Sequence, residues 1–288
     1  MHIGIFAPAS NPFATPEYLD ALGRGADVRG FHAIWLAEHV VLFDEYASRY
    51  PYSADGKLPA GGEHGILDPF GTMAFLAAVT KRIRLGTGIC LVPQRNPVYT
   101  AKDVATVDWL SNGRVDFGVG IGWLAEEFAA LGVPFERRAA RCREYLDVMR
   151  RLWCDSVSEY AGEFYRLPAC RQYPKPVQRP HPPLWFGGES DAALRRVAAL
   201  GQGWYPFSIE PDVLARRLRV LERLLAERGR TRADITVNIC PYMRPVDLDL
   251  VRRYRDAGAD QVTLLGLSSE PERLLDHLAE TIVVRLTS

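Results

Sequence analysis

The segment Val115-Asp116-Phe117-Gly118-Val119-Gly120-Ile121-Gly122 is an almost continuous run of apolar residues and glycines. Such runs are typical of strands that are buried on both faces of a parallel sheet. Seven similar β-like runs occur elsewhere in the chain, and segments with helical patterns lie between them. The eight runs are His2–Pro8, Ala33–Val40, Ile83–Val92, Val115–Gly122, Leu184–Ser190, Gly203–Phe207, Ile235–Met243 and Gln261–Leu267.

The segments between these runs carry the signals that begin and end helices. Thr15 and Asp68 each precede a proline, which places a capping side chain before proline at the first helical position. Gly30 and Gly229 lie where a left-handed residue would end a helix. Apolar residues recur at helical spacing at Leu214, Leu218, Leu221 and Leu225, and at Cys142, Tyr145, Leu146, Met149, Leu152 and Trp153. Opposite the second stripe we expect a solvated charged face formed by Glu136, Arg137, Arg138, Arg141, Arg143 and Glu144.

Strands that alternate with helices predict right-handed βαβ units and a parallel sheet. Eight such units within 288 residues predict an α/β fold, a (β/α)8 TIM barrel that forms a single domain over residues 1–288. A doubly wound sheet is the alternative. Two long loops interrupt the repeat, Val41–Leu67 after the second strand and Asp155–Pro183 before the fifth. The first leaves the face where barrels carry active sites, so we expect it to be a lid or a pocket wall.

Composition excludes several classes of protein. The 35 basic residues balance 35 acidic ones, whereas a nucleic-acid-binding protein would normally be basic. No apolar run approaches the roughly 18 residues of a membrane-spanning helix, and the N-terminus lacks the pattern of a signal peptide. The five cysteines form no CxxC pair, which fits a reducing compartment and offers no zinc site. We expect a soluble cytoplasmic protein without nucleic-acid, membrane or metal partners.

Candidate functional residues lie at the ends of the predicted strands. Glu38-His39 ends the second strand, where a carboxylate and an imidazole can orient a ligand and move a proton, or simply close the loop. Glycines at the ends of strands three, four and five would let a flat or phosphorylated ligand approach the backbone, although a bulge or kink in the strand would by itself explain those of strand three. Gly187-Gly188-Glu189-Ser190 precedes a helix, so it could bind a phosphate or act as a plain N-cap.

Several of these motifs together resemble the bacterial luciferase-like superfamily of flavin and deazaflavin barrel enzymes, in particular its probable coenzyme-F420-dependent oxidoreductases. The resemblance covers nearly the whole chain. It is carried by Gly30-Phe31 through Glu38-His39, Arg49-Tyr50-Pro51-Tyr52, Arg82-Ile83-Arg84-Leu85-Gly86-Thr87-Gly88, Leu110-Ser111-Asn112-Gly113-Arg114, Gly118 through Trp123 with Glu126-Glu127-Phe128, Pro174-Lys175-Pro176-Val177-Gln178, His181-Pro182-Pro183-Leu184-Trp185 and Gly187-Gly188.

The resemblance implies roles for individual positions. The tricyclic ring would lie against a cis peptide bond between Gly88 and Ile89, and the phosphate on Gly187, Gly188 and Ser190. The implied cofactor-binding residues are Glu38, Thr87, Gly88, Ile89, Ile121, Gly122, Glu126, Gly187, Gly188 and Ser190. As catalytic residues the resemblance implies His39, which would handle the proton, and Glu38, which would face the ring and tune His39. The expected substrate pocket comprises Tyr46, Tyr50, Trp123 and Tyr205.

One position departs from the sugar-phosphate dehydrogenases of this superfamily, which carry a glutamate where this chain has Trp123. An indole does not exchange protons at neutral pH, so sugar-phosphate oxidation is not expected. The resemblance implies instead hydride transfer between coenzyme F420 and a small organic substrate, with reduction of C=C or C=N or oxidation of an alcohol. The alternatives are an FMN-dependent monooxygenase with a separate reductase and a non-catalytic cofactor-binding barrel. Relatives of this kind are commonly homodimers, which we expect here as well.

Overall fold

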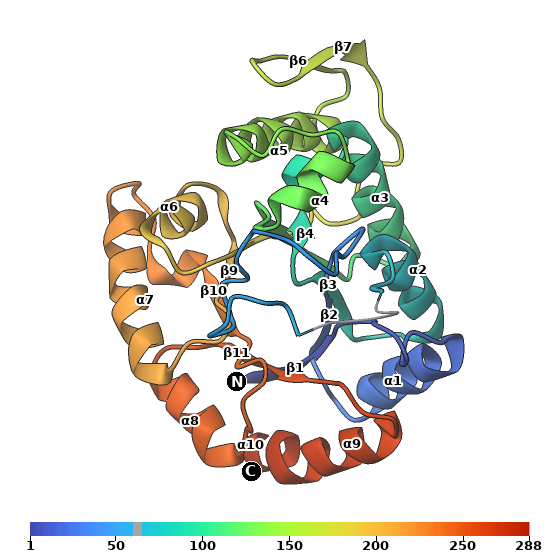
Figure 1. Cartoon of the computed structure of the whole chain (residues 1–288), viewed down its shortest axis with the longest axis vertical. Coiled ribbons are helices and arrows are strands. Elements are labelled where there is room, and N and C mark those ends of the chain that lie inside the picture. Colours follow the sequence, from blue (N-terminus) through green and yellow to red (C-terminus); the bar gives the residue numbers. More distant parts are fainter. Residues whose placement is uncertain (60–64, 288) are drawn as a thin grey trace.

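The computed structural model describes residues 1–59 and 65–287, and these form a closed eight-stranded parallel barrel surrounded by helices (Figure 1). Strand β1 pairs with β2 on one side and with β11 on the other, which closes the barrel. The strands, in their order around the barrel, are β1 (His2–Ala7), β2 (Ala33–Leu36), β3 (Arg84–Thr87), β5 (Val115–Gly120), β8 (Leu184–Gly187), β9 (Gly203–Tyr205), β10 (Thr236–Ile239) and β11 (Gln261–Leu265). All eight predicted strands are therefore present, and the predicted TIM barrel is confirmed. A short extra strand, β4 (Cys90–Leu91), pairs with the end of β5.

The helices begin where the capping signals predicted. The Thr15 hydroxyl accepts a hydrogen bond from the Tyr18 N–H, and the Asp68 carboxylate accepts one from the Gly71 N–H. Gly30 and Gly229 have positive φ angles of 81° and 66° after their helices. The helices are α1 (Pro16–Val28), α2 (Pro69–Val79), α3 (Pro97–Leu110), α4 (Ala125–Ala130), α5 (Arg138–Cys154), α6 (Asp191–Leu200), α7 (Pro211–Ala226), α8 (Leu248–Asp256), α9 (Pro271–Leu278) and α10 (Val284–Thr287).

Helix α5 corrects one expectation. Arg141 and Glu144 were expected on a solvated face, yet both side chains are buried. The Arg141 guanidinium donates to backbone carbonyls, including that of Pro93, and the Glu144 carboxylate accepts hydrogen bonds from the N–H groups of Phe164 and Tyr165. Because these backbone groups satisfy them, the two charged side chains can be buried at a tolerable free energy.

Large aromatic side chains fill the interior of the barrel. Trp35 lies over Gly86, and Trp185 lies over Gly203, where a Cβ atom would come within 2.5 Å and 2.1 Å of the respective indole rings. Trp35 also stacks on Tyr205, with ring centroids 4.7 Å apart. A second and larger core lies between the strands and the surrounding helices. These aromatic side chains therefore close the interior of the barrel below the C-terminal ends of the strands.

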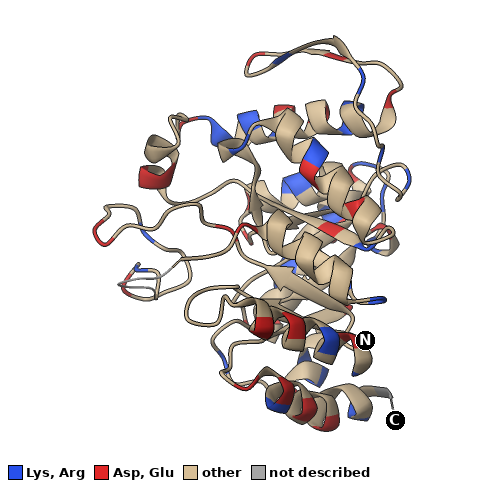
Figure 2. Cartoon of the chain, turned by 90° about the vertical axis from the view of Figure 1, so that its right-hand side faces the viewer, with Lys and Arg blue, Asp and Glu red and all other residues tan. Residues whose placement is uncertain are grey.

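The two long loops lie in different places. The segment after β2 runs across the C-terminal end of the barrel; within it, residues 60–64 are outside the part that the structure describes. The segment before β8 forms an antiparallel hairpin, β6 (Ser158–Ala161) and β7 (Arg166–Cys170), which projects beyond α5 (Figure 1). Figure 2 shows that the positions of basic and acidic residues are interspersed along the helices and loops around the barrel. No helix in the described residues is long and apolar enough to cross a membrane.

Candidate functional site

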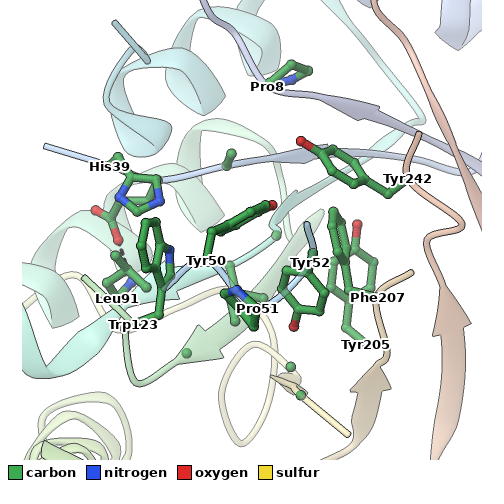
Figure 3. A pocket seen from close by; sticks show the side chains of 18 of the residues that line it. Pro8, His39, Tyr50, Pro51, Tyr52, Leu91, Trp123, Tyr205, Phe207 and Tyr242 are labelled. Carbon is green, nitrogen blue, oxygen red and sulfur yellow. Dashed lines mark hydrogen bonds between the residues drawn. The ribbon is translucent and has the colours of Figure 1, made fainter. Parts of the chain in front are cut away.

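A cavity of about 550 Å³ lies at the C-terminal ends of the barrel strands. Its volume falls within the range of small-molecule sites. The loop after β2 contributes Tyr50, Pro51 and Tyr52 to its wall, so this loop forms the pocket wall that the sequence predicted (Figure 3). Of the residues predicted for the site, the cavity is lined by Glu38, His39, Tyr50, Gly88, Ile89, Ile121, Gly122, Trp123, Gly187, Gly188, Ser190 and Tyr205.

Three of the predicted site residues are not among the cavity-lining residues. Thr87 is fully buried, and its hydroxyl donates to the Gly118 carbonyl at 2.7 Å, so it ties two barrel strands together. The Glu126 carboxylate accepts a hydrogen bond from the Ala47 N–H at 2.7 Å and braces the loop after β2. Burial raises the pKa of Glu126, but hydrogen bonds from that loop outweigh it and lower the pKa to about 2. Tyr46 accepts from the Leu58 N–H at 2.7 Å within the same loop.

His39 is held in place by Glu127, a residue that the sequence did not single out for the site. The Nδ1 atom of His39 lies 3.0 Å from Glu127 Oε2, and the Glu127 side chain is fully buried. Gln94 and the Val40 N–H also donate to Glu127. Burial raises the pKa of Glu127, but these hydrogen bonds outweigh it and keep the pKa below its usual value. A charged carboxylate at Nδ1 fixes the tautomer of His39 and leaves Nε2 for the cavity.

Glu38, the expected tuning partner of His39, is held elsewhere. Its Oε1 atom accepts from Arg95 Nε at 2.6 Å, and its Oε2 atom accepts from the Leu91 N–H at 2.5 Å. Arg95 in turn forms an ion pair with Asp68 at 2.5 Å. Both carboxylate oxygens of Glu38 are therefore bonded within the protein. The carboxylate that contacts His39 is therefore Glu127, whereas Glu38 accepts from Arg95 and the Leu91 N–H.

The peptide bond between Gly88 and Ile89 is cis, as the resemblance implied. The Ile89 side chain fills the space that glycines leave at neighbouring strand ends. A Cβ atom at Gly120 would come within 2.4 Å of Ile89 Cδ1, and one at Gly187 within 2.6 Å. The glycine-rich strand ends therefore make room first for Ile89, which forms part of the cavity wall.

The cavity also reaches the N-terminus of α6. Ser190 is the N-cap of this helix, and its hydroxyl accepts from the Ala193 N–H at 3.2 Å. Gly188 has a positive φ of 92°, which exposes the backbone at the turn. Arg196 lines the cavity from the same helix, and within residues 1–59 and 65–287 no acidic side chain forms an ion pair with it. Burial lowers the pKa of Arg196.

Glu189 is a second group that sequence reasoning missed, although it stands between two predicted residues. It lines the cavity, and its Oε1 atom accepts from the Phe207 N–H at 2.8 Å. Burial raises the pKa of Glu189 to about 7, against the lowering effect of that hydrogen bond. Among the described residues its carboxylate takes part in no ion pair.

Trp123 occupies the wall beside His39 (Figure 3), and their ring centroids are 5.8 Å apart. It also contacts Tyr50 edge-on at 5.2 Å. The wall at this position is thus aromatic, with Trp123 in contact with both His39 and Tyr50. Among the described residues no group of three or more His, Cys, Asp or Glu side chains could hold a metal ion.

This barrel carries, at the C-terminal ends of its strands, a cavity of small-molecule size with a histidine–carboxylate pair on its wall, which is the arrangement of a (β/α)8 enzyme. The family model for luciferase-like monooxygenases matches residues 1–277, and the chain belongs to that family.

Individual relatives agree with this assignment. An uncharacterised protein of Mycobacterium tuberculosis (strain ATCC 25618 / H37Rv) is 33% identical over 280 residues, which cover 97% of this chain and 95% of that protein. Among solved structures, a long-chain alkane monooxygenase superposes with a TM-score of 0.82 at 15% identity, covering 100% of this chain and 91% of the other. An F420-dependent secondary alcohol dehydrogenase, in complex with an F420–acetone adduct, superposes with a TM-score of 0.80 at 19% identity and 98% coverage of both chains. At these identities the two structures support the fold alone.

Proposed function

We propose that the protein is an oxidoreductase that transfers a hydride between coenzyme F420 and a small organic substrate. The observation that carries this proposal is the His39–Glu127 pair, which places a proton-handling group on the wall of the cavity at the C-terminal ends of the barrel strands. Hydride transfer to carbon commonly requires a proton to be delivered or removed as well. When bound, the deazaflavin would supply or accept the hydride.

The residues present fit a flavin-like group with an anionic side chain. The α6 N-terminus with Ser190 offers backbone N–H groups to an anion, and the Arg196 guanidinium lies in the same cavity without an ionic partner in the described residues. The buried hydroxyl of Tyr205, beside Gly88, interacts with the Cys240 thiol, which is a weak hydrogen-bonding group. Because Tyr205 also lines the cavity, its hydroxyl can in addition contact a ligand atom there.

Each residue of the site then has a defined task. His39 holds a proton at Nε2 and exchanges it with the substrate, while Glu127 stabilises the protonated ring. Arg196 and the α6 N-terminus at Ser190 would hold the phosphate of the cofactor, and Ile89 and Tyr205 would line the place of its ring. The aromatic walls exclude water from the reacting atoms.

The experiment that tests this proposal is a titration of the apoprotein with F420 and with FMN, followed by absorbance and fluorescence. We expect F420 to bind at least tenfold more tightly. A screen of alkenes, imines and secondary alcohols should then reveal turnover that follows F420 absorbance. Tight FMN binding with negligible F420 binding would contradict the proposal.

A second candidate, an FMN-dependent monooxygenase with a separate reductase, is favoured by one observation. The wall around His39 and Tyr50 is aromatic, since Trp123 contacts both rings, and such a wall suits oxygen chemistry that must be sheltered from water. This candidate predicts oxygen consumption that is coupled to substrate oxidation when reduced FMN is supplied. F420 should then have no effect.

A further inference from the structure

Four aromatic side chains from distant parts of the chain meet on one side of the cavity. Phe207 lies at the centre, with ring centroids 4.6 Å from Tyr242, 4.8 Å from Tyr52 and 5.7 Å from Phe6. All four line the cavity. We call them the Phe207 cluster. Figure 3 shows Phe207, Tyr52 and Tyr242 together, with His39 and Trp123 on the opposite side of the drawn site.

The carboxylate of Glu189 lies at the edge of this cluster. It accepts a hydrogen bond from the backbone N–H of Phe207, and its charge acts on Tyr52. Two of the other charged or ionisable groups that line the cavity have partners within the protein, because Glu38 pairs with Arg95 and His39 bonds to Glu127. Arg217, whose charge acts on Glu189, forms its ion pair with Asp191 at 2.6 Å.

The faces of the aromatic rings are likewise without a cation. The Lys and Arg side chains that lie over aromatic rings in the described residues do so elsewhere, for instance Arg95 over Phe70, and none lies over the Phe207 cluster. Electron-rich ring faces attract organic cations, and a carboxylate at the edge of the rings adds direct charge attraction. Aromatic rings beside an acidic side chain are therefore suited to binding an organic cation.

We propose that the Phe207 cluster and Glu189 form the substrate subsite, and that the substrate carries a flat organic cation, such as an N-substituted pyridinium or iminium group. The proposal rests on the proposed function, since it assigns the substrate of the same cavity. It places the positive charge at one side of the site, away from the proton-handling pair of His39 and Glu127. Arg196 remains available for an anionic cofactor.

The ionisation of Glu189 gives the proposal a measurable signature. Its pKa of about 7 means that a cation binds best above neutral pH and displaces a proton when it binds near pH 7. The neighbouring groups do not titrate in this range. Burial raises the pKa of Tyr52, and it raises the pKa of Cys240 to about 12. The Arg217 guanidinium is paired with Asp191.

The test compares two probes of almost identical shape, N-methylpyridinium and toluene, by isothermal titration of the full-length protein at constant ionic strength. At pH 8.5 we expect N-methylpyridinium to bind at least tenfold more tightly than toluene. At pH 6.0 its affinity should fall about tenfold, because roughly one tenth of Glu189 is then ionised, while toluene is unaffected. Titrations near pH 7 in buffers of different ionisation enthalpy should show proton release with N-methylpyridinium only.

A matched pair of variants assigns the effect to one residue. Glu189→Gln keeps the shape and an acceptor for the Phe207 N–H, and it should weaken N-methylpyridinium binding about tenfold at pH 8.5 without changing toluene binding. Glu222→Gln, at an exposed position on α7, is the control and should change neither. Circular dichroism confirms that both variants are folded, and the proton-release measurement on the unmodified protein needs no variant.

Equal affinity for the two probes, or an unchanged affinity in Glu189→Gln, would overturn the proposal. These outcomes are separate from the failure of the proposed function, which is read from F420 binding alone. If F420 binds but the cation has no advantage, the substrate subsite is wrong and the hydride-transfer function stands. If the cation binds as expected but F420 does not, the hydride-transfer function is wrong and the cation subsite stands.

Discussion

The two ends of the barrel treat their buried charged groups differently. At the N-terminal end, the Asp27 carboxylate accepts hydrogen bonds from the N–H groups of Lys81, Arg82 and Ile83, at 2.7 to 2.9 Å. Nearby, the Arg114 guanidinium donates to backbone carbonyls, including that of Ile83 at 2.7 Å. These side chains hold the loops that enter the strands.

At the C-terminal end the protein also saturates the carboxylates of Glu38 and Glu127, but Glu189 and Arg196 line the cavity without an ion pair among the described residues. Unlike Asp27 and Arg114, these two side chains are thus available to a ligand. Groups of the first kind stabilise the fold, whereas groups of the second kind contribute to binding. The predictions that follow test this division.

The largest effect is expected at the saturated end. Asp27→Ala removes the acceptor of three backbone N–H groups, and we expect the free energy of unfolding to fall by about 3 kcal/mol, at roughly 1 kcal/mol for each lost hydrogen bond. Urea unfolding followed by circular dichroism measures this change. The control is Asp20→Ala on the same helix, which loses only a surface ion pair with Arg24 and should cost under about 1 kcal/mol. An equal fall in the free energy of unfolding for Asp27→Ala and Asp20→Ala would show that the saturated Asp27 carboxylate stabilises the fold no more than a surface ion pair does.

At the cavity end, His39→Ala should leave stability and cofactor affinity nearly unchanged and slow turnover at least a hundredfold, about 2.7 kcal/mol. The physical reason is that the variant removes the proton-handling group, while the buried Glu127 carboxylate keeps its hydrogen bonds from Gln94 and the Val40 N–H. Steady-state rates with a substrate found in the screen, together with fluorescence titration of the cofactor, separate the two effects. Unchanged turnover would show that His39 handles no proton in the reaction.

The strands could be predicted from sequence because each is a local apolar run, and the caps at Thr15 and Asp68 were equally local signals. The partners of charged side chains could not be predicted in this way. Glu127 lies 88 residues from His39 in the sequence and meets it only through the closure of the barrel. Adjacent Glu38 is no substitute, because consecutive side chains of an extended segment point in opposite directions.

The same reasoning explains the glycines and helix α5. From sequence alone the glycines at the ends of β5 and β8 predict room for a ligand, whereas in the structure Gly120 and Gly187 accommodate the Ile89 side chain. A helical pattern likewise cannot show that a loop passing over α5 offers backbone N–H groups to Glu144. Periodicity reports which face is apolar, and it carries no information about backbone groups brought from elsewhere.

A smaller effect is expected from the two histidines stacked at the N-terminal end. The rings of His2 and His32 lie 4.0 Å apart. Burial, and then the neighbouring His2, lower the pKa of His32 to about 4. Between about pH 6.5 and 4 the unfolded chain binds a proton that the folded protein does not, so the free energy of unfolding decreases as the pH falls through this window.

His32→Gln removes this contribution, so its stability should depend less on pH than that of the unmodified protein. We expect a difference of about 1 to 2 kcal/mol between pH 6.5 and 4, since the ring is partly exposed and solvent screens part of the effect. Urea unfolding at several pH values measures it. Exposed His277 provides the control, because His277→Gln should leave the pH dependence as it is. Parallel curves for all three proteins would show that His32 does not titrate as expected.

The smallest effect is expected for Arg196. Its measurement distinguishes a role of the Arg196 guanidinium in binding an anionic cofactor from a role in stabilising the fold. If it binds an anionic cofactor, Arg196→Gln should weaken cofactor binding by about five- to tenfold, the range for one charge-assisted hydrogen bond. Raising the salt concentration should narrow the difference, since screening reduces the attraction. Riboflavin, which lacks the phosphate, should bind both proteins equally, and the free energy of unfolding of the ligand-free protein should not fall. A loss of stability instead would mean that Arg196 belongs with Asp27 and Arg114 among the groups that hold the fold together.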